Sequence, residues 1–481
     1  MKFGKLDTNE PILNRLNGDK VIWIIVFLLS LISIALIYSS SSSLAYKEKT
    51  TNFAFLIKQF QFVLIGLMAL FFCYKIPLGW YRTLTYLIFG ISLFLLAITP
   101  ILGSEINGAK RWLSFGGITF QPAELVKISI ILYLARTLEM HELKTFKDFV
   151  IRVLAPIGLT CVLIMIGSVS TALFVGLLSF LVLFIAGVKW SYLFKSAGIA
   201  GIALVLLIVF HLAFGILPRL DTATSRLKKF FVKTEINETL AAEEKQKQAD
   251  KTFQADMAKI AISSVGVIGK GPGNSTQRYV LPHPYSDYIF TIIIEEYGLI
   301  GGAFVLMLYL WFLFRCIILI KNCTKVFTAI TVGGLSLLIF IQASLHILVN
   351  VGFLPVTGHT LPLISLGGTS LVILSCAFGI ILSVSRTIDV DASKKAAREK
   401  EQMKEALEEM DKTTDLEEKI KFASKAIELN RPAMKTISKK DWGDPKFQAI
   451  RKQEQEAKKQ ILKKHIANPL NSFTGYFEFL R

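Results

Sequence analysis

The chain has 481 residues, of which 53% are hydrophobic, and its formal net charge at pH 7 is +18. A soluble protein has no means of burying so much apolar surface, so the composition excludes a soluble globular fold and indicates an integral membrane protein. In such a protein the excess of lysine and arginine indicates basic cytoplasmic ends, with anionic headgroups or phosphates as neighbours. No aromatic-basic module accompanies the charge, so we expect no nucleic-acid partner.

The first 20 residues are polar and lack the short basic region and apolar core of a cleavable signal peptide, so we expect the first apolar segment to be a retained span. The five cysteines lie in or beside apolar segments without metal-type spacing, which favours packing roles. They are Cys73, Cys161, Cys316, Cys323 and Cys376.

Ten apolar runs are long enough to cross about 30 Å of hydrocarbon, which takes about 20 residues of helix. They cover residues 21–40, 53–74, 82–102, 122–139, 148–167, 170–188, 195–216, 288–316, 326–350 and 364–385. The sequence therefore predicts an all-α polytopic membrane protein with ten transmembrane helices.

Lysine and arginine predict the orientation of these helices, because they accumulate in cytoplasmic loops. With ten spans, the basic segments fall on one face if both termini are cytoplasmic. Residues 1–20 then form a cytoplasmic N-terminus, and residues 21–385 form the membrane domain. Residues 217–287 form a large extracytoplasmic loop between spans 7 and 8, with a helical middle. Residues 386–481 form a charged, mostly helical cytoplasmic tail.

Polar residues follow the third apolar run in "NGAKRWLSFGGITFQPAELVKISIILYLAR", residues 107–136. Lys110 and Arg111 lie in a short loop that the topology places outside, against the charge rule, so we expect the protein to use them. Gln121 precedes a proline that suits the first turn of a helix. Glu124 and Lys127 follow at spacing i, i+3 and are expected to pair inside the membrane. The alternative for this pair is a neutral ion pair that only locks helix packing.

Three acids lie in "LPHPYSDYIFTIIIEEYGLIGG", residues 281–302, although carboxylates are costly in hydrocarbon. Asp287 is expected at the outer water boundary, where it stays ionised. The alternative for Asp287 is a helix cap. Glu295 and Glu296 lie deeper and are expected to pair with Lys or Arg, or with backbone groups freed by nearby glycines.

The ninth run carries a stripe of polar residues, and the loop after it is rich in glycine and proline. Gln342, His346 and Asn350 stand four apart on one helix face and are predicted to make interhelical hydrogen bonds. Residues 350–372 are expected to form a re-entrant or tightly folded loop beside a polar cavity, because irregular backbone at membrane depth is tolerated only there.

The glycine-rich stretch "GVIGKGPGNST", residues 266–276, has the appearance of a phosphate-binding loop. A Walker loop needs glycine and Ser or Thr where this chain has Ser264 and Gly271. The predicted topology also places the stretch outside the cell, so we reject nucleotide binding.

Three stretches resemble the signature regions of the SEDS family (shape, elongation, division and sporulation): "NGAKRWLSFGGITFQPAELVK", "GKGPGNSTQRYVLPHPYSDYIFTIIIEEYGLIG" and "LPVTGHTLPLISLGGTS". The resemblance covers residues 20–388 and is strongest to the cell-division, FtsW-type branch, with the rod-elongation, RodA-type branch second.

The resemblance implies a peptidoglycan glycosyltransferase that polymerises lipid II at the outer face of the bacterial cytoplasmic membrane, at the division septum, and releases undecaprenyl diphosphate. It also implies a class B penicillin-binding protein and other cell-division proteins as partners. It implies no certain cofactor and leaves open a divalent cation, Mg²⁺ or Mn²⁺, so metal ligands are unknown.

The resemblance also assigns roles to individual residues. Asp287 matches the acid proposed as the general base. The expected substrate-binding residues are Arg111, Lys127, Lys110, Gln121, Thr357 and Ser365. The expected supporting residues are Glu124, Glu295, Glu296, His346 and Asn350.

This chain departs from the family pattern at several positions. It has "LPHPYSDY" where the family has "LPE-x-HTDF", so His283 replaces an acid and Tyr285 replaces a histidine. It also has "GSVSTA" at residues 167–172 where the family has "PDLGTA". Two other functions stay open at this point, a lipid II flippase and a non-catalytic scaffold for division proteins.

Overall fold

The computed structural model describes residues 17–42, 44, 49–106, 109–115, 118–214, 257–258, 261–262, 266–281 and 283–412. The chain divides into two compact units, Met1–Ile388 and Asp389–Arg481. The predicted N-terminus before residue 17, most of the predicted outer loop and the predicted tail beyond residue 412 lie outside the described residues.

Helices make up almost all of the described chain. They are α2 (Lys20–Ser40), α4 (Asn52–Lys75), α5 (Leu78–Leu102), α6 (Pro122–Met140), α7 (Phe146–Phe149), α8 (Ala155–Gly167), α9 (Val169–Ile185), α10 (Trp190–Phe214), α13 (Ile289–Lys321), α14 (Val326–Asn350) and α15 (Thr369–Lys412). A π-helical turn, η1 (Val150–Leu154), joins α7 to α8, and a 3₁₀ turn, η2 (Gln277–Tyr279), precedes α13.

Each of the ten predicted segments contains one of these helices, with α7, η1 and α8 together forming the fifth. Eight helical stretches in the described chain are long and apolar enough to span a membrane; α6 and α9 are not among them. Helix α9 has 17 residues, which corresponds to about 26 Å of length. Helix α6 is less apolar because it carries two acids and two cations, but most of its side chains are buried against protein.

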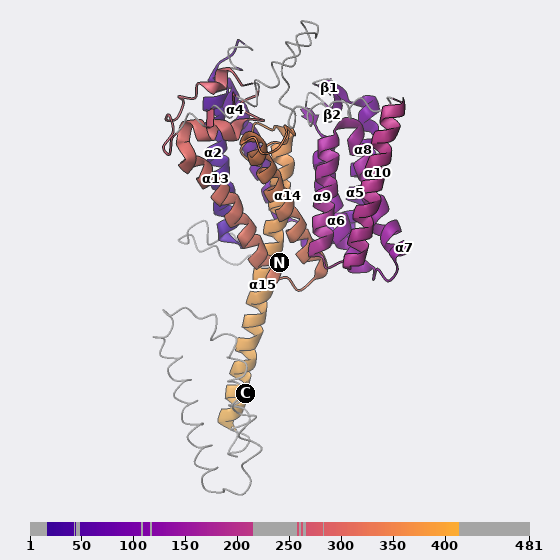
Figure 1. Cartoon of the computed structure of the whole chain (residues 1–481). Helices are drawn as coiled ribbons and strands as arrows, with labels where there is room; N and C mark the ends of the chain where they lie inside the picture. Colours follow the sequence, from indigo (N-terminus) through magenta and orange to yellow (C-terminus); the bar gives the residue numbers. More distant parts are fainter. Residues whose placement is uncertain are drawn as a thin grey trace. The chain divides into compact units, whose positions relative to one another are not determined.

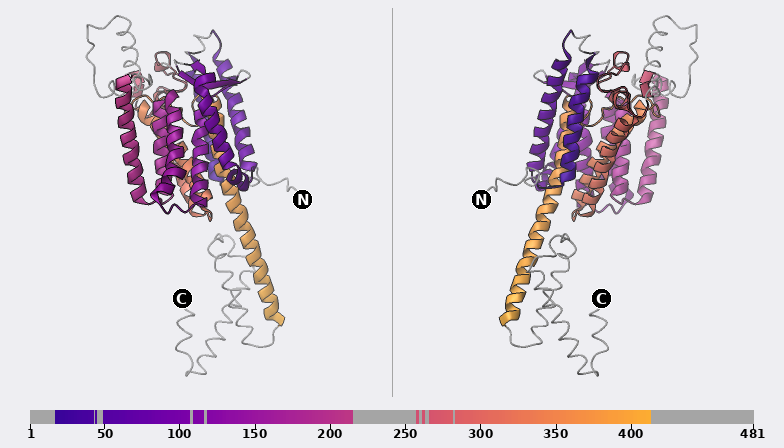
Figure 2. Two further views of the ribbon diagram at one scale, coloured as in Figure 1. Left: turned by 90° about the vertical axis from the view of Figure 1, so that its right-hand side faces the viewer. Right: turned by 90° about the vertical axis from the view of Figure 1, so that its left-hand side faces the viewer.

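The helices of the first unit stand side by side, and the short strands lie at one end of the bundle (Figure 1). Two further views show the same arrangement (Figure 2). Helix α14 packs against α6, α9 and α13, and 61% of its apolar window is buried, compared with 11% for α10. Helix α14 is therefore a central element, whereas α10 exposes its apolar side chains as a lipid-facing helix does.

The all-α prediction is wrong in one place, because the linker between α5 and α6 forms a small antiparallel sheet. Its strands are β1 (Ser104–Ile106), β2 (Ala109–Phe115) and β3 (Ile118–Phe120), in the order β1-β2-β3. Six of the 13 strand residues are β-branched or aromatic, and the sequence reads Asn-Gly and Gly-Gly between the strands, which are hairpin signals. The sequence analysis considered only apolar runs of about 20 residues, so these short strands were not predicted.

The predicted tenth span, 364–385, also needs correction. Helix α15 begins only at Thr369, because Gly368 has φ +51° and ends the loop before it. Residues 364–368 therefore belong to the loop after α14. The helical prediction for the start of the tail is confirmed as far as residue 412.

Candidate active site

Strand β2 carries the two cations that the sequence singled out, Lys110 and Arg111. The last strand leads directly to Gln121, the residue that precedes the first turn of α6, and Pro122 occupies that turn as predicted. A side chain at Gly167 would come within 3.0 Å of the Arg111 side chain. Glycine at the end of α8 therefore makes room for the arginine.

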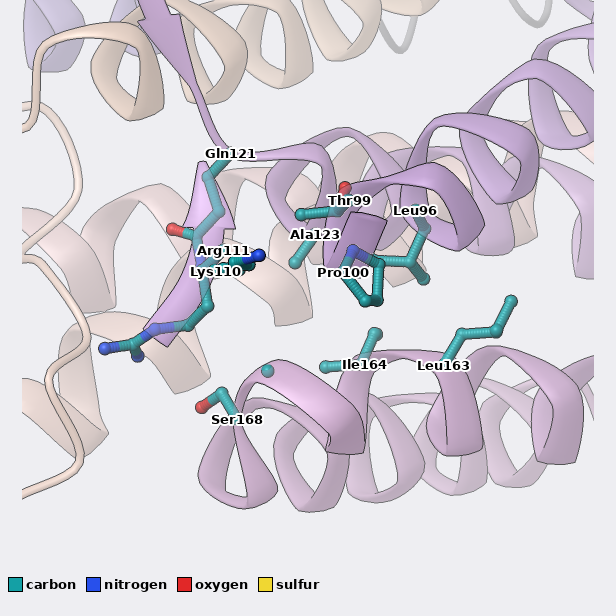
Figure 3. A pocket seen from close by; sticks show the side chains of 11 residues that line it. Leu96, Thr99, Pro100, Lys110, Arg111, Gln121, Ala123, Leu163, Ile164 and Ser168 are labelled. Atoms are coloured by element: carbon teal, nitrogen blue, oxygen red, sulfur yellow. The ribbon is translucent and has the colours of Figure 1, made fainter. Parts of the chain in front are cut away.

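An open pocket lies between the strands and helices α5 and α8 (Figure 3). It is lined by Leu96, Thr99, Pro100, Lys110, Arg111, Gln121, Ala123, Leu163, Ile164, Gly167 and Ser168. The polar groups of Arg111, Gln121 and Ser168 lie toward one side of the pocket, and the apolar side chains of α5 and α8 form the other (Figure 3). Such a pocket suits a ligand with an anionic group attached to an apolar chain.

The predicted ion pair between Glu124 and Lys127 is present, with Lys127 Nζ 2.7 Å from Glu124 Oε2. Lys127 Nζ also donates to Gln342 Oε1 at 2.8 Å and lies 5.4 Å from the ring centre of Phe174. Lys127 is 0% exposed. Its ammonium group therefore ties α6 to α14 and α9, and no surface of it is open to a substrate in this structure.

Asp287 lies in a turn, residues 283–288, just before α13. The cap position of α13 is Tyr288, which makes no side-chain cap. Asp287 is half-buried, its N–H donates to the His283 carbonyl at 3.0 Å, and its Oδ1 accepts from Ser286 Oγ at 2.9 Å. The carboxylate therefore lies beside the start of the helix and does not cap it.

Three successive carbonyl groups in this turn each accept a hydrogen bond from a distant part of the chain. The Tyr285 carbonyl accepts from the Leu366 N–H at 3.0 Å. The Ser286 carbonyl accepts from Ser365 Oγ at 2.9 Å, and the Asp287 carbonyl accepts from Asn350 Nδ2 at 2.9 Å. The main chain that carries the carboxylate is therefore fixed from two sides, by α14 and by the loop after it.

Two residues of the stripe on α14 make the predicted interhelical hydrogen bonds, Gln342 to Lys127 of α6 and Asn350 to Thr291 of α13. The stripe also bonds to the loop that follows α14. Gln342 Nε2 donates to the Thr360 carbonyl at 3.0 Å, and His346 Nδ1 donates to the His359 carbonyl at 2.8 Å. Gln342 and His346 thereby fasten the glycine- and proline-rich loop that we call the third loop, residues 351–368.

Ser365, predicted to bind substrate, is 2% exposed. Its hydroxyl accepts from the Leu361 N–H at 2.9 Å and donates to the Ser286 carbonyl. Both of its hydrogen-bonding functions are used inside the protein, which favours a supporting role. Thr357 lies in the same loop and is half-buried.

The cationic strand and the Asp287 turn lie at the same end of the bundle. The Thr119 carbonyl of β3 accepts from Thr369 Oγ1 at 3.0 Å, and the third loop that precedes Thr369 is bonded to the Asp287 turn through Leu366. The third loop thus connects the pocket beside β2 to the Asp287 carboxylate.

Glu295 is paired with a lysine, as predicted, and its partners come from the loop before α13. Lys270 Nζ lies 2.6 Å from Glu295 Oε1, and Thr276 donates to the same oxygen through its N–H at 3.0 Å and its hydroxyl at 2.8 Å. Ser275 Oγ donates to the other carboxylate oxygen. These residues belong to the glycine-rich stretch 266–276, which resembled a phosphate-binding loop. In this structure its N–H, hydroxyl and ammonium donors bind the Glu295 carboxylate.

Glu296 accepts a hydrogen bond from Ser39 Oγ at the end of α2. Arg278 donates to the Ser39 carbonyl at 3.1 Å and interacts electrostatically with Glu296. Within the described residues the Glu296 carboxylate therefore bonds to Ser39 of α2, and Arg278 bonds to Ser39 rather than forming the predicted ion pair with Glu296.

Helix α13 is broken at Gly298, where φ is +69° and ψ is −169°. The stretch 267–271 crosses the break and bonds its freed backbone: Lys270 N–H donates to the Glu295 carbonyl, and Ile300 N–H donates to the Val267 carbonyl. Unpaired backbone at membrane depth is costly, so this crossing explains why the break is tolerated.

Replacing Gly298 with alanine should destabilise the protein. Only glycine adopts this backbone conformation readily, at a cost to other residues of about 1–3 kcal/mol. The added Cβ would also overlap the Val267 carbonyl oxygen. Thermal unfolding in detergent micelles should show a clearly lower midpoint for Gly298→Ala, whereas Gly90→Ala, in an open position on α5, should leave the midpoint unchanged or raise it. Equal midpoints for both variants would contradict this account.

Sequence reasoning did not single out His359. It is 7% exposed and packs against Phe174, with ring centres 5.0 Å apart and ring planes inclined at 43°. Burial, together with the nearby Lys127 charge, lowers the pKa of His359 to about 3, so its ring is neutral at physiological pH. The polar character of a loop residue between prolines was the available signal, but a loop position has no periodicity that reveals its burial.

Within the residues that the structure describes, no three His, Cys, Asp or Glu side chains lie together as a metal site would require.

Fold and site together define a polytopic membrane protein with a cationic pocket and a half-buried carboxylate at one end of its helices. The chain belongs to the FtsW/RodA/SpoVE family, because the model of this family, described as "Cell cycle protein", matches residues 19–389. The resemblance to SEDS proteins that the three sequence motifs indicated is thereby confirmed.

Curated relatives agree with this assignment. The chain is 31% identical over 371 residues to a "Probable peptidoglycan glycosyltransferase FtsW" of Hydrogenovibrio crunogenus, with 75% of this chain and 90% of the relative covered. It is 32% identical to the protein of the same name from Haemophilus ducreyi, covering 77% and 90%. It is 29% identical to the Bacillus subtilis "Stage V sporulation protein E", covering 77% and 98%. The relatives named FtsW favour the FtsW-type branch.

Solved structures support the fold. The chain superposes with a TM-score of 0.61 and 24% identity on a structure described as "Structural coordination of polymerization and crosslinking by a peptidoglycan synthase complex", covering 77% of this chain and 98% of that one. It superposes on the Thermus thermophilus rod shape determining protein RodA with a TM-score of 0.55 and 24% identity, covering 78% and 98%.

Proposed function

We propose that this chain is a peptidoglycan glycosyltransferase that polymerises lipid II into glycan strands at the outer face of the cytoplasmic membrane. The observation that carries the proposal is the Asp287 turn, whose three carbonyls are held in place at the same end of the bundle as the cationic pocket. A general base needs a fixed position beside the reacting hydroxyl, and a diphosphate leaving group needs cations nearby.

In this mechanism the 4-hydroxyl of one sugar attacks the anomeric carbon of another. The new glycosidic bond forms as the bond from that carbon to the diphosphate oxygen breaks. The bonding electrons leave with undecaprenyl diphosphate, and the proton of the hydroxyl passes to the Asp287 carboxylate. Mg²⁺ or Mn²⁺ at the diphosphate would add to the positive charge that the protein supplies there.

Arg111 and Lys110 are assigned to the diphosphate, because they lie on the strand that borders the pocket. Gln121 lines the same pocket, whose apolar side suits the start of the lipid chain. Thr357 is assigned to the substrate from the family resemblance. We assign Lys127 and Ser365 to support, because both are buried and hydrogen bonded within the protein.

The membrane topology that accompanies this function has ten spans, with α6 and α9 as the two that are shorter or less apolar. Both termini are then cytoplasmic, and the large loop before α13 is extracytoplasmic. By analogy with the relatives named FtsW, we place the protein at the division septum, with a class B penicillin-binding protein and other division proteins as partners.

The test is a reconstitution of the full-length protein, with its transpeptidase partner, in liposomes that contain labelled lipid II. Polymerisation should give a ladder of glycan strands on a gel, and a muramidase should digest the ladder. Movement of lipid II between leaflets without polymer would instead support a flippase. Partner binding without either activity would support a scaffold, and either result would overturn the proposed reaction.

A further inference from the structure

The N-terminus of helix α13, which follows the proposed base Asp287, is not capped by the side chain at its own cap position. The first N–H groups of a helix have no partner within it, and the side chain at the cap position commonly accepts from the third of them. Tyr288 occupies the cap position and makes no such bond. Asp287 is the neighbouring residue with a suitable carboxylate, yet its Oδ1 accepts from Ser286 Oγ.

Asn350, the last residue of α14, takes over the capping bond. Its Oδ1 accepts from the Thr291 N–H at 3.2 Å and from the Thr291 hydroxyl at 2.9 Å. Thr291 is the third residue of α13, so this is the N–H that a cap residue ordinarily satisfies.

The other half of the same amide holds the main chain of the catalytic residue. Asn350 Nδ2 donates to the Asp287 carbonyl at 2.9 Å and to the His346 carbonyl at 2.8 Å. The amide thus makes two donor and two acceptor contacts, which is its full capacity. Asn350 is 1% exposed, and reversing its amide would place N–H against N–H, so the contacts fix its orientation.

We propose that Asn350 is a positioning residue for the reaction, because it caps α13 from another helix and holds the Asp287 main chain with the same amide. The Asp287 carboxylate is thereby released from capping and directed to the substrate. This inference rests on the proposed function, in which Asp287 is the base.

The proposal predicts a loss in turnover without a loss in substrate binding. Asn350→Asp keeps an acceptor for Thr291 but lacks the donor to the Asp287 carbonyl, whereas Asn350→Leu removes both bonds at similar volume. Since a misplacement of about 1 Å can cost a catalytic step about 100-fold, we expect kcat to fall at least about tenfold in both variants, with the KM for lipid II within about twofold.

The comparison uses full-length protein with its partner, and Thr85→Val as the control for a lost buried hydrogen bond outside the site. Thr85→Val should keep wild-type kcat even where its unfolding midpoint matches that of Asn350→Asp. A purely structural role for Asn350 would instead lower kcat in proportion to stability in all three variants, and would overturn the proposal.

Asp287→Asn is measured in parallel to separate the two hypotheses. If Asp287→Asn polymerises lipid II normally, Asp287 is not the general base and the proposed mechanism is overturned. If Asp287→Asn is inactive while Asn350→Asp and Asn350→Leu turn over at the wild-type rate, only the positioning role of Asn350 is overturned.

Discussion

Asp287→Asn should abolish glycan polymerisation while the protein folds and binds its partner normally. The amide has nearly the same shape as the carboxylate and still accepts from Ser286, but it does not take the proton of the attacking hydroxyl. General-base catalysis contributes about 10²–10⁴-fold to a rate, so we expect polymer formation to fall by at least about 100-fold. The measurement is the initial rate of glycan formation from labelled lipid II.

The control for this prediction is Asp148→Asn, the same change at another half-buried acid, on α7, whose carboxylate also accepts from a nearby hydroxyl, that of Thr145; this variant should polymerise at the wild-type rate. Asp287→Asn should also have the wild-type unfolding midpoint, because the turn is held through its main-chain carbonyls rather than through the carboxylate. If Asp287→Asn retains more than about a tenth of the activity, the carboxylate is not the base.

Lys127→Met should cause a large loss of stability, because it leaves Glu124 without its partner in a buried position. Glu124 is 8% exposed, and breaking a buried ion pair by removing one partner costs about 3–5 kcal/mol. Gln342 Oε1 loses a donor at the same time. We expect a much lower unfolding midpoint in detergent, and a lower polymerisation rate as Gln342 loosens its bond to the third loop.

The double variant Lys127→Met/Glu124→Met should regain most of the stability, since it removes the uncompensated charge as well. A double-mutant cycle on the unfolding midpoints isolates this coupling. If Lys127→Met keeps wild-type stability and instead raises the KM for lipid II, Lys127 contacts the substrate, as the family resemblance first implied.

Several polar positions stood out in the sequence because they interrupt an apolar helical pattern. The spacing of Glu124 and Lys127 was sufficient to predict their pairing, since residues three apart on a helix are neighbours. The spacing of the α14 stripe likewise predicted the interhelical bonds of Gln342 and Asn350, whereas His346 bonds to a loop carbonyl. Both cases depend on helix periodicity alone.

Partners outside a helix were not predictable in this way. Glu295 was expected to pair with Lys or Arg or with freed backbone, and it does pair with a lysine, but the sequence did not show that this lysine comes from the glycine-rich loop that appeared to bind phosphate. Ser365 was assigned to the substrate, although its hydroxyl is bonded inside the protein. A loop residue has no period, so its direction becomes known only when the surrounding helices are in place.

The sequence by itself determined where the helices are and which polar side chains stand inside them, because hydrocarbon excludes charge and any charge that remains is conspicuous. The tertiary structure alone decided what each polar group does. The partner of Lys127 on α14 lies 215 residues away, and the side chains that hold the Asp287 turn come from α14 and the third loop. Local pattern contains no information about contacts at such separations, and these contacts decide that Asp287 remains available for chemistry while Asn350 caps its helix.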